Sequence, residues 1–213
     1  MHALGKIPEW SSGLACAVGL ITTDGNLSPD GRHLGLVSKD YDQVELFKEL
    51  LNLSNRISHK NSGFNPDGVY WYIQFGDIVL YQWLVEIGLM PNKSKSLAAL
   101  DIPGEFFFDF LRGHLDGDGN IRSYDDPVYP NSQRLYIVFH SASLRHLQWM
   151  QETVERLIGL HGYIEEATRV WRLYYAKSES LVLLQKMYHH EDVPCLKRKR
   201  ELIEKYLQSE PKW

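Results

Sequence analysis

The stretch LRGHLDGDGN at residues 111–120 decides the fold, because its pattern occurs earlier in the chain as AVGLITTDGN at residues 17–26. Both copies have glycine at the third position and end in Asp-Gly-Asn. Apolar residues recur through each copy at three- and four-residue steps, which is the spacing of one helix face. We expect each helix to end at Gly25 or Gly119, since glycine accepts the left-handed conformation in which many helices end. Two copies of one pattern predict two similar halves.

The composition is that of a globular chain. It has 213 residues, of which 44% are apolar and 23% charged, enough for one large domain or two small fused ones. The net charge of −4 excludes a uniformly basic coat, although a local basic surface stays open. No apolar run is long enough to span a bilayer and no signal peptide is visible, so we expect no membrane contact. Two cysteines predict reduced thiols in an intracellular, cytoplasmic protein, with an organelle open as an alternative.

Both halves have the same order of elements, with the motif helix first: helix, two strands, helix, two strands, helix. The predicted strands are residues 33–38, 56–59, 69–75, 134–140, 162–166 and 170–176, and the helices after the motifs are residues 41–53, 78–87, 143–160, 181–188 and 196–208. This order predicts an α+β fold with two antiparallel sheets related by a pseudo-twofold axis. Residues 1–98 would form the first repeat, with a linker from about residue 90, and residues 99–213 the second repeat with a C-terminal helix.

Asp24 and Asp118 are the candidate catalytic residues of this arrangement. Small residues on each motif helix, including Gly19 and Gly113, allow the two helices to pack closely, so that both aspartates meet at the helix ends. A carboxylate at a helix C-terminus is disfavoured by roughly 0.3–1 kcal/mol, and two close carboxylates repel each other. A divalent cation such as Mg²⁺ relieves both costs. Metals at this place could activate a water and stabilise the leaving oxygen of a displacement at phosphorus.

Other interpretations of these residues are weaker. The two aspartates could simply form turns before glycine, but two copies at two helix ends disfavour this reading. A calcium-binding loop is excluded, because its sixth and twelfth positions would be Ile121 and Pro127 instead of Gly and Glu. Residues 189–195, with two histidines and a cysteine, lack the spacing of zinc ligands. The basic cluster at residues 197–200 could contact phosphates or form the exposed face of a helix.

Both copies resemble the motif of the LAGLIDADG homing endonucleases. Residues 111–119 match it strongly, and residues 17–25 match it more loosely because Thr22 and Thr23 replace the usual sixth and seventh residues. The acidic eighth position is intact as Asp24 and Asp118. The similarity in element order covers roughly residues 9–207. Two motifs in one chain resemble the monomeric, double-motif branch of the family.

The resemblance implies a fold, an activity and a set of ligands. Two pseudo-symmetric αββαββα repeats would form a saddle whose sheets straddle the major groove of double-stranded DNA. Asp24 and Asp118 would bind two or more Mg²⁺ ions, with Mn²⁺ or Ca²⁺ able to substitute for binding, and Thr23 and Gly117 would add backbone carbonyls. The implied reaction is hydrolysis of both strands at a long asymmetric target, often an intron or intein insertion site, leaving short 3′ overhangs.

The family also commonly places a basic residue after the second strand of each half. Lys39 fits this place and is the third candidate catalytic residue, whereas we expect Ser141 at the equivalent position of the second half. Lys93 is a weaker candidate for phosphate contact.

The outward faces of the strands are the candidate DNA surface. Alternate residues of a strand point to opposite faces, and polar side chains on an exposed face can read base edges in the major groove. An ordinary solvated sheet face is the alternative. The candidates are Asn26, Ser28, Arg32, Tyr70, Tyr72, Gln74, Asn120, Arg122, Tyr124, Arg134, Tyr136, His140, Arg172 and Tyr174.

A second class of function stays open beside the endonuclease. The same fold would serve a nucleic-acid-binding protein that is catalytically silent or bifunctional, such as an intron maturase. Retention of both aspartates favours the enzyme, although a bifunctional protein would also keep them. A purely structural domain would leave the paired carboxylates unexplained.

Overall fold

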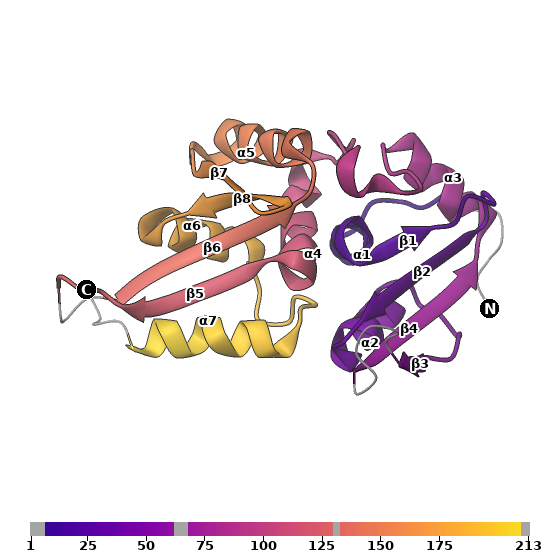
Figure 1. Ribbon diagram of the computed structural model, residues 1–213, viewed down its shortest axis with the longest axis horizontal. Helices are drawn as coiled ribbons and strands as arrows, with labels where there is room; N and C mark the ends of the chain where they lie inside the picture. Colours follow the sequence, from indigo (N-terminus) through magenta and orange to yellow (C-terminus); the bar gives the residue numbers. More distant parts are fainter. Residues whose placement is uncertain (1–6, 62–67, 130–132, 210–213) are drawn as a thin grey trace.

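The computed structural model describes residues 7–61, 68–129 and 133–209 and shows two sheets with their helices (Figure 1). The first half contains α1 (Ser12–Thr23), β1 (Gly25–Leu27), β2 (His33–Ser38), α2 (Tyr41–Leu50), β3 (Ser58–Asn61), β4 (Val69–Gly76) and α3 (Ile78–Glu86). Two short 3-10 turns, η1 (Lys93–Lys95) and η2 (Gly104–Phe106), connect it to the second half. The second half contains α4 (Phe107–Asp118), β5 (Asn120–Asp125), β6 (Gln133–Ser141), α5 (Leu144–Ile158), β7 (Tyr163–Ala167), β8 (Val170–Tyr175), α6 (Lys177–Met187) and α7 (Lys197–Ser209).

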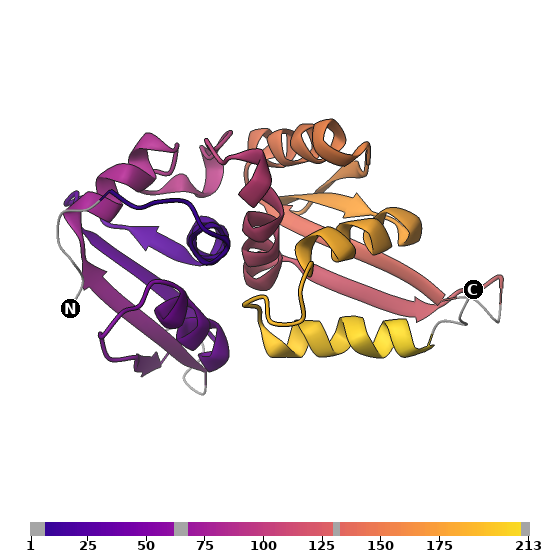
Figure 2. The ribbon, with the colours of Figure 1, turned by 180° about the vertical axis from the view of Figure 1, so that it is seen from behind.

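The two sheets have the same topology. Their strand orders are β1-β2-β4-β3 and β5-β6-β8-β7, and every neighbouring pair is antiparallel. Helices α1 and α4 lie between the two sheets in both views (Figures 1 and 2). The predicted α+β fold with two antiparallel sheets is therefore confirmed, whereas the division of the chain at residue 98 stays a prediction.

The apolar pattern explains why these segments pack as they do. Helix α1 buries residues on nearly all its sides, because it lies against its own sheet and against α4. Its N-terminus is capped by the Ser11 hydroxyl, which accepts a hydrogen bond from Leu14 N at 3.1 Å. In the sheets, alternate residues such as Ile73, Phe75, Ile137 and Phe139 are buried. One face of each sheet therefore belongs to the core, and the other is left for polar side chains.

The glycines that end the motif helices serve a different purpose from the one expected. Gly119 is extended, with φ −81° and ψ 161°, and Gly25 is also not among the glycines with positive φ. A Cβ on Gly25 would lie 2.5 Å from Ile21 Cα, and one on Gly119 would lie 2.5 Å from Leu115 Cδ1. Glycine is required because the chain turns back on the last helical turn without room for a side chain, and the left-handed prediction was wrong.

Several element boundaries also differ from the prediction. Helix α6 begins at Lys177, four residues before the predicted start, because its first turn is polar and carries no apolar periodicity. Strand β3 covers Ser58–Asn61 instead of residues 56–59, since its pairing partners lie at the start of β4. Within the described part of the chain, no helix is both long and apolar enough to cross a membrane.

Candidate metal centre and nucleic-acid interface

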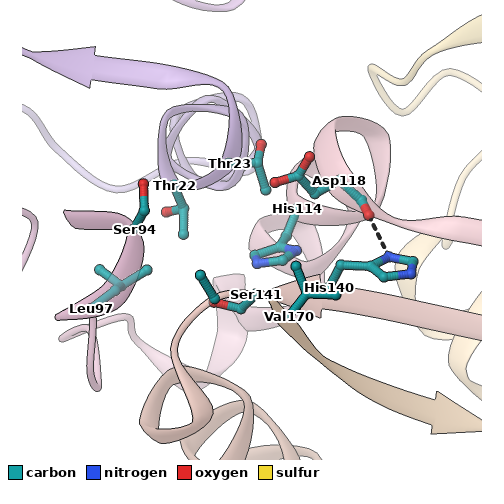
Figure 3. Close-up of a pocket in the computed structure, with 10 residues that line it drawn as sticks. Thr22, Thr23, Ser94, Leu97, His114, Asp118, His140, Ser141 and Val170 are labelled. Atoms are coloured by element: carbon teal, nitrogen blue, oxygen red, sulfur yellow. Dashed lines mark hydrogen bonds between the residues drawn. The ribbon is translucent and has the colours of Figure 1, made fainter. Parts of the chain in front are cut away.

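The two motif helices cross with their backbones in contact. A Cβ on Gly19 would lie 2.3 Å from Phe110 O, and one on Gly113 would lie 2.0 Å from Cys16 O. Only glycine fits at these two positions, because the obstacle on each side is backbone. The crossing brings the C-terminal ends of α1 and α4 together, so that Thr23 in the last turn of α1 lies beside Asp118 at the end of α4 (Figure 3).

Asp24 and Asp118 lie together at these helix ends. The Asp24 Oδ2 atom is 3.1 Å from the place where a Cβ on Gly117 would stand. Burial, together with the charge of Asp118, raises the pKa of Asp24 to about 6. Asp118 is exposed as a residue, but the protein around its carboxyl group still desolvates this group in part and raises its pKa as well. The arrangement disfavours two negative charges, as the sequence predicts, whereas the role of these residues as metal ligands stays a prediction.

Thr23 and Gly117 face each other across the pseudo-twofold axis. A Cβ on Gly117 would stand 1.9 Å from Thr23 Oγ1, so the threonine occupies space that the glycine leaves free. Thr23 Oγ1 also donates to Leu20 O at 3.0 Å. This complementarity explains why threonine is tolerated at the seventh motif position of the first half. The proposed contribution of the two backbone carbonyls to metal binding stays a prediction.

Gln43 contacts the first aspartate directly and was missed in the sequence. Its Nε2 donates to Asp24 Oδ2 at 2.5 Å, and its Oε1 accepts a hydrogen bond from Ser38 Oγ at 3.0 Å. The side chain is only 2% exposed. Gln43 lies within α2, 19 residues from Asp24 and outside any motif, so no local signal could have indicated this contact.

A buried lysine lies at the end of each motif helix. Lys93 Nζ donates to Gly25 O, and Lys199 Nζ donates to Leu115 O and, at 2.9 Å each, to Asp116 O and Gly119 O. Burial lowers the pKa of both lysines to about 8, although the nearby aspartates act in the opposite direction. Both ammonium groups stabilise the negative ends of the helices.

The role of Lys199 could not be predicted from the repeat. An offset of 94 residues would carry Lys93 to Met187, because the connections in the two halves differ in length. The basic cluster at residues 197–200 is more than an exposed helix face, because two of its side chains have protein partners. Lys199 is 4% exposed, and Arg198 Nε is 2.6 Å from Asp40 Oδ2 in the first half.

Lys39 follows β2 and, unlike Lys93 and Lys199, is not buried. It is exposed, and its Nζ lies 5.5 Å from the centre of the Tyr70 ring. The expected counterpart, Ser141, needs correction. Gly25 pairs with Leu36 and Asn120 pairs with Val138, so this register puts Asp24 level with Val37 and Asp118 level with His140. Ser141 therefore corresponds to Ser38, and Ala142 corresponds to Lys39. The catalytic role of Lys39 itself stays a prediction.

A cavity of about 330 Å³ lies beside Asp118 (Figure 3). Its lining includes Thr22, Thr23, His114 and His140, and Asp118 forms part of its wall. His140 Nδ1 is 2.7 Å from Asp118 O, an acceptor, so this nitrogen carries the proton. Burial lowers the pKa values of His114 and His140, which favours the neutral form of both imidazoles. The cavity is large enough to admit water to the Asp118 carboxylate.

The polar face of the first sheet gathers several of the predicted DNA-contacting residues. Asn26, Ser28, Tyr72 and Gln74 line one depression of about 260 Å³. Arg32 is exposed at the end of this face, while Tyr70 and Tyr72 lie beneath the ammonium groups of Lys39 and Lys60. Asn26, Ser28, Tyr72 and Gln74 therefore lie together, and two lysines lie against the tyrosines of this face.

The second sheet agrees only in part with the expected interface. Asn120, Arg122 and Tyr124 are exposed, and the rings of Tyr124 and Tyr136 stack with 6.2 Å between their centres. Tyr174, expected on the open face, is only 7% exposed because Tyr163 stacks on it at 4.8 Å.

Two of the predicted arginines of the second sheet, Arg134 and Arg172, contact other side chains. Arg134 Nε forms an ion pair with Asp126 Oδ2 at 2.7 Å. Arg172 is half-buried between His140 and Glu165, its neighbours on the adjacent strands. Arg134 is therefore held by an ion pair, whereas Arg172 Nε is buried without a hydrogen-bond partner in the described part of the chain.

The carboxylates fit a metal that takes few protein ligands. Among residues 7–61, 68–129 and 133–209, no cluster of three or more His, Cys, Asp and Glu side chains could hold a metal ion. Two carboxylates offer only oxygen ligands, whereas zinc usually takes cysteine sulfur and histidine nitrogen. The carboxylates suit Mg²⁺, which keeps water ligands and completes its shell with substrate phosphate.

Comparisons with known proteins identify the fold. No family model and no curated protein matches the chain. The LAGLIDADG meganuclease I-AabMI, solved bound to uncleaved DNA, superposes with a TM-score of 0.61 at 13% identity over 91% of this chain and 88% of its own. This chain has the LAGLIDADG fold. I-DmoI, in complex with DNA and Mn, has a TM-score of 0.52 at 14% identity over 83% of this chain and 96% of its own.

This chain also superposes on part of a longer protein. Full-length DUF199/WhiA from Thermatoga maritima superposes with a TM-score of 0.58 at 15% identity. The match covers 98% of this chain but 64% of the WhiA chain. At identities this low, the similarity shows the LAGLIDADG fold alone. The activity has to be inferred from the residues of the site.

The pKa of Asp24 predicts a pH dependence for metal binding by this LAGLIDADG chain. Its folded value of about 6 lies above the ordinary 3.8, so without metal the folded state loses stability as the pH rises from about 4 to about 6. Mg²⁺ bound to Asp24 would compete with this proton, and we expect Mg²⁺ to raise the melting temperature at pH 7.5 and to do so far less at pH 5. Thermal unfolding with Mg²⁺ or with chelator measures the difference. An equal shift at both pH values, or an unchanged shift in Asp24→Asn, would contradict the assignment.

Proposed function

We propose that this chain is a site-specific, divalent-metal-dependent DNA endonuclease that cuts both strands of a long asymmetric target and leaves short 3′ overhangs. The observation that carries the proposal is the meeting of Asp24 and Asp118 at the ends of two crossing helices, between two sheets with polar faces. The target class that best suits such an enzyme is an intron or intein insertion site.

The site residues divide the work of hydrolysis. Asp24 and Asp118 would hold two or more Mg²⁺ ions, with Mn²⁺ or Ca²⁺ able to substitute for binding, and the carbonyls of Thr23 and Gly117 would complete the protein ligands. The bound metals would supply an activated water and stabilise the leaving oxygen. Lys93 and Lys199, fixed on the carbonyls of Gly25 and Gly119, contribute positive charge beside the phosphate. The cavity beside Asp118 admits water to the second carboxylate.

The two polar sheet faces would bind double-stranded DNA through its major groove. Both halves belong to one chain, so a monomer presents two different faces to an asymmetric sequence. I-AabMI and I-DmoI, which share the fold, were solved with DNA, the latter also with Mn. Because the net charge is −4, binding depends on local arginine and lysine residues and should weaken as salt is raised.

A library of duplexes incubated with the protein in Mg²⁺, and in parallel with chelator, tests the proposal. We expect one sequence to be cut in both strands in Mg²⁺ and left intact in chelator. Tight binding at one sequence without any metal-dependent break would refute the nuclease and leave a binding protein.

A nucleic-acid-binding protein without nuclease activity, such as an intron maturase, is the second candidate. The observation that favours it is the similarity of the fold to full-length DUF199/WhiA, which extends over 98% of this chain. The two candidate functions differ in whether they require the carboxylates of Asp24 and Asp118. A binding protein would keep its full activity in Asp24→Asn and Asp118→Asn, whereas an endonuclease would not.

Arg172 should contribute base readout at one place in the target. Its half-buried guanidinium lies beside His140 on the polar face of the second sheet, with Nη1 3.4 Å from Tyr174 Oη. We expect Arg172→Ala to relax the base preference at one position by about 1–3 kcal/mol while other positions keep theirs. Binding selection with randomised targets measures this. Uniform weakening at every position would instead indicate a phosphate contact.

A further inference from the structure

The two carboxylates of the site are held differently. Asp24 Oδ2 accepts a hydrogen bond of 2.5 Å from Gln43, and Gln43 is itself fixed by Ser38 Oγ at 3.0 Å. This chain of hydrogen bonds runs from the end of β2 through α2 to the end of α1. Gln43 is buried, so solvent cannot easily replace the contact. The orientation of the Asp24 carboxylate is therefore set by the folded protein before any ligand arrives.

The second half lacks this support. Asp40 and Ser143 are the N-cap residues of α2 and α5, so the position of Gln43 corresponds to His146. His146 points elsewhere: its Nδ1 is 2.9 Å from Ala98 O, and its ring stacks on His114. In the described part of the chain, no side chain donates a hydrogen bond to the carboxylate of Asp118. Its orientation is left to the ligand.

We propose that Gln43 is a positioning residue for Asp24, which makes the Asp24 site the tighter of two unequal divalent-metal sites and the strand it serves the first to be cut. The inference rests on the proposed function in taking both aspartates as metal ligands. A hydrogen bond to a ligating carboxylate orients it, and loss of such a partner typically costs about 10–100-fold in metal affinity. Asp118 must be ordered when the metal binds, which weakens its site by comparison.

The hydrogen bond from Gln43 leaves room for a metal. A carboxylate offers about four lone-pair positions on its two oxygens. The single amide donor occupies one of them, on Oδ2, and Asp24 Oδ1 stays available. Gln43 therefore acts through Asp24 and needs no contact with metal or DNA.

Binding of Mn²⁺ to the purified protein, followed through the electron paramagnetic resonance signal of the free ion, tests the proposal without any DNA. We expect two affinity classes, of which Asp24→Asn removes the tighter and Asp118→Asn the weaker. Gln43→Met, which keeps the side-chain length but lacks the donor, should weaken only the tighter class by about 10–100-fold. Gln151→Met is the matched control, because its Nε2 donates to His161 O at 2.8 Å, away from the carboxylates. Ser38→Ala, which frees Gln43, should give a smaller loss and serves if Gln43→Met fails to fold.

A strand-resolved cleavage assay adds the kinetic readout. With limiting Mn²⁺, the strand whose cleavage depends on Asp24 should be cut first in the wild type, and Gln43→Met should delay that strand alone. The inference is overturned if the tighter class depends on Asp118, if no class depends on Asp24, or if a folded Gln43→Met binds Mn²⁺ like the wild type. Unequal Mn²⁺ sites in a protein that cuts no DNA would sustain the inference and refute the proposed function.

Discussion

Asp118→Asn is expected to lower the rate of double-strand cleavage by about a thousandfold or more and to leave DNA affinity nearly unchanged. The carboxylate is a proposed metal ligand, and a metal supplies several kcal/mol of transition-state stabilisation, with each 1.4 kcal/mol worth a factor of ten. Binding depends instead on the polar faces of two whole sheets, which the substitution does not touch. Cleavage of a supercoiled plasmid and a gel-shift titration measure the two quantities.

The same variant has a second, opposite signature. Burial raises the pKa of Asp118, so ionisation of this group opposes folding in the absence of metal. Asp118→Asn should therefore raise the melting temperature in chelator at pH 8 while it abolishes cutting. Asp101→Asn, at an exposed position, is the control and should change neither. Full double-strand cutting by Asp118→Asn would show that the carboxylate holds no essential metal.

Gly113→Ala should be among the most destabilising single substitutions in this protein. The new Cβ would stand 2.0 Å from Cys16 O and 2.8 Å from Cys16 C, and backbone atoms cannot rotate away. Helices α1 and α4 would have to separate, which loosens the packing between the two halves. We expect a loss of about 3 kcal/mol or more in the free energy of unfolding, hence a fall of roughly 6–12 °C in melting temperature.

Gly13→Ala is the matched control for this effect. Gly13 also belongs to the crossing helix pair, but a Cβ there would only meet Leu50 Cδ2 at an ordinary 3.6 Å. Because alanine is the better helix former, we expect Gly13→Ala to stabilise the protein by up to about 1 kcal/mol. Thermal or urea unfolding of both variants decides the matter. Equal stabilities would contradict a helix crossing that depends on glycine at position 113.

The motifs made the centre of the molecule predictable. Identical residues at equivalent positions, such as Gly19 and Gly113, specify a symmetric helix crossing, and the aspartates that end the helices must then lie close together. The alternation of apolar residues likewise indicated the buried faces of the strands, including Ile73 and Phe139. These features depend on local periodicity and on the internal repeat, and both are visible in a single sequence.

The residues around the aspartates depend on contacts that periodicity does not describe. Gln43 and Lys199 reach the helix ends from distant elements, through loops whose lengths differ between the halves. The hairpin after the motif is longer in the second half, so a fixed residue offset does not identify equivalent positions beyond it. The residue equivalent to Lys39 is therefore Ala142 instead of Ser141. Tyr174 has the alternation of an outward residue, yet stacking on Tyr163 covers it. Such packing among neighbours is a property of the folded sheet.

The central claim is that the two aspartates hold divalent metal beside DNA, and anomalous diffraction from crystals grown with Mn²⁺ and a bound target duplex tests it most directly. The account predicts Mn²⁺ peaks within about 2.0–2.6 Å of carboxylate oxygens of both Asp24 and Asp118 and of phosphate oxygens of the DNA. Manganese bound elsewhere, with the two carboxylates without metal beside an intact duplex, would contradict it.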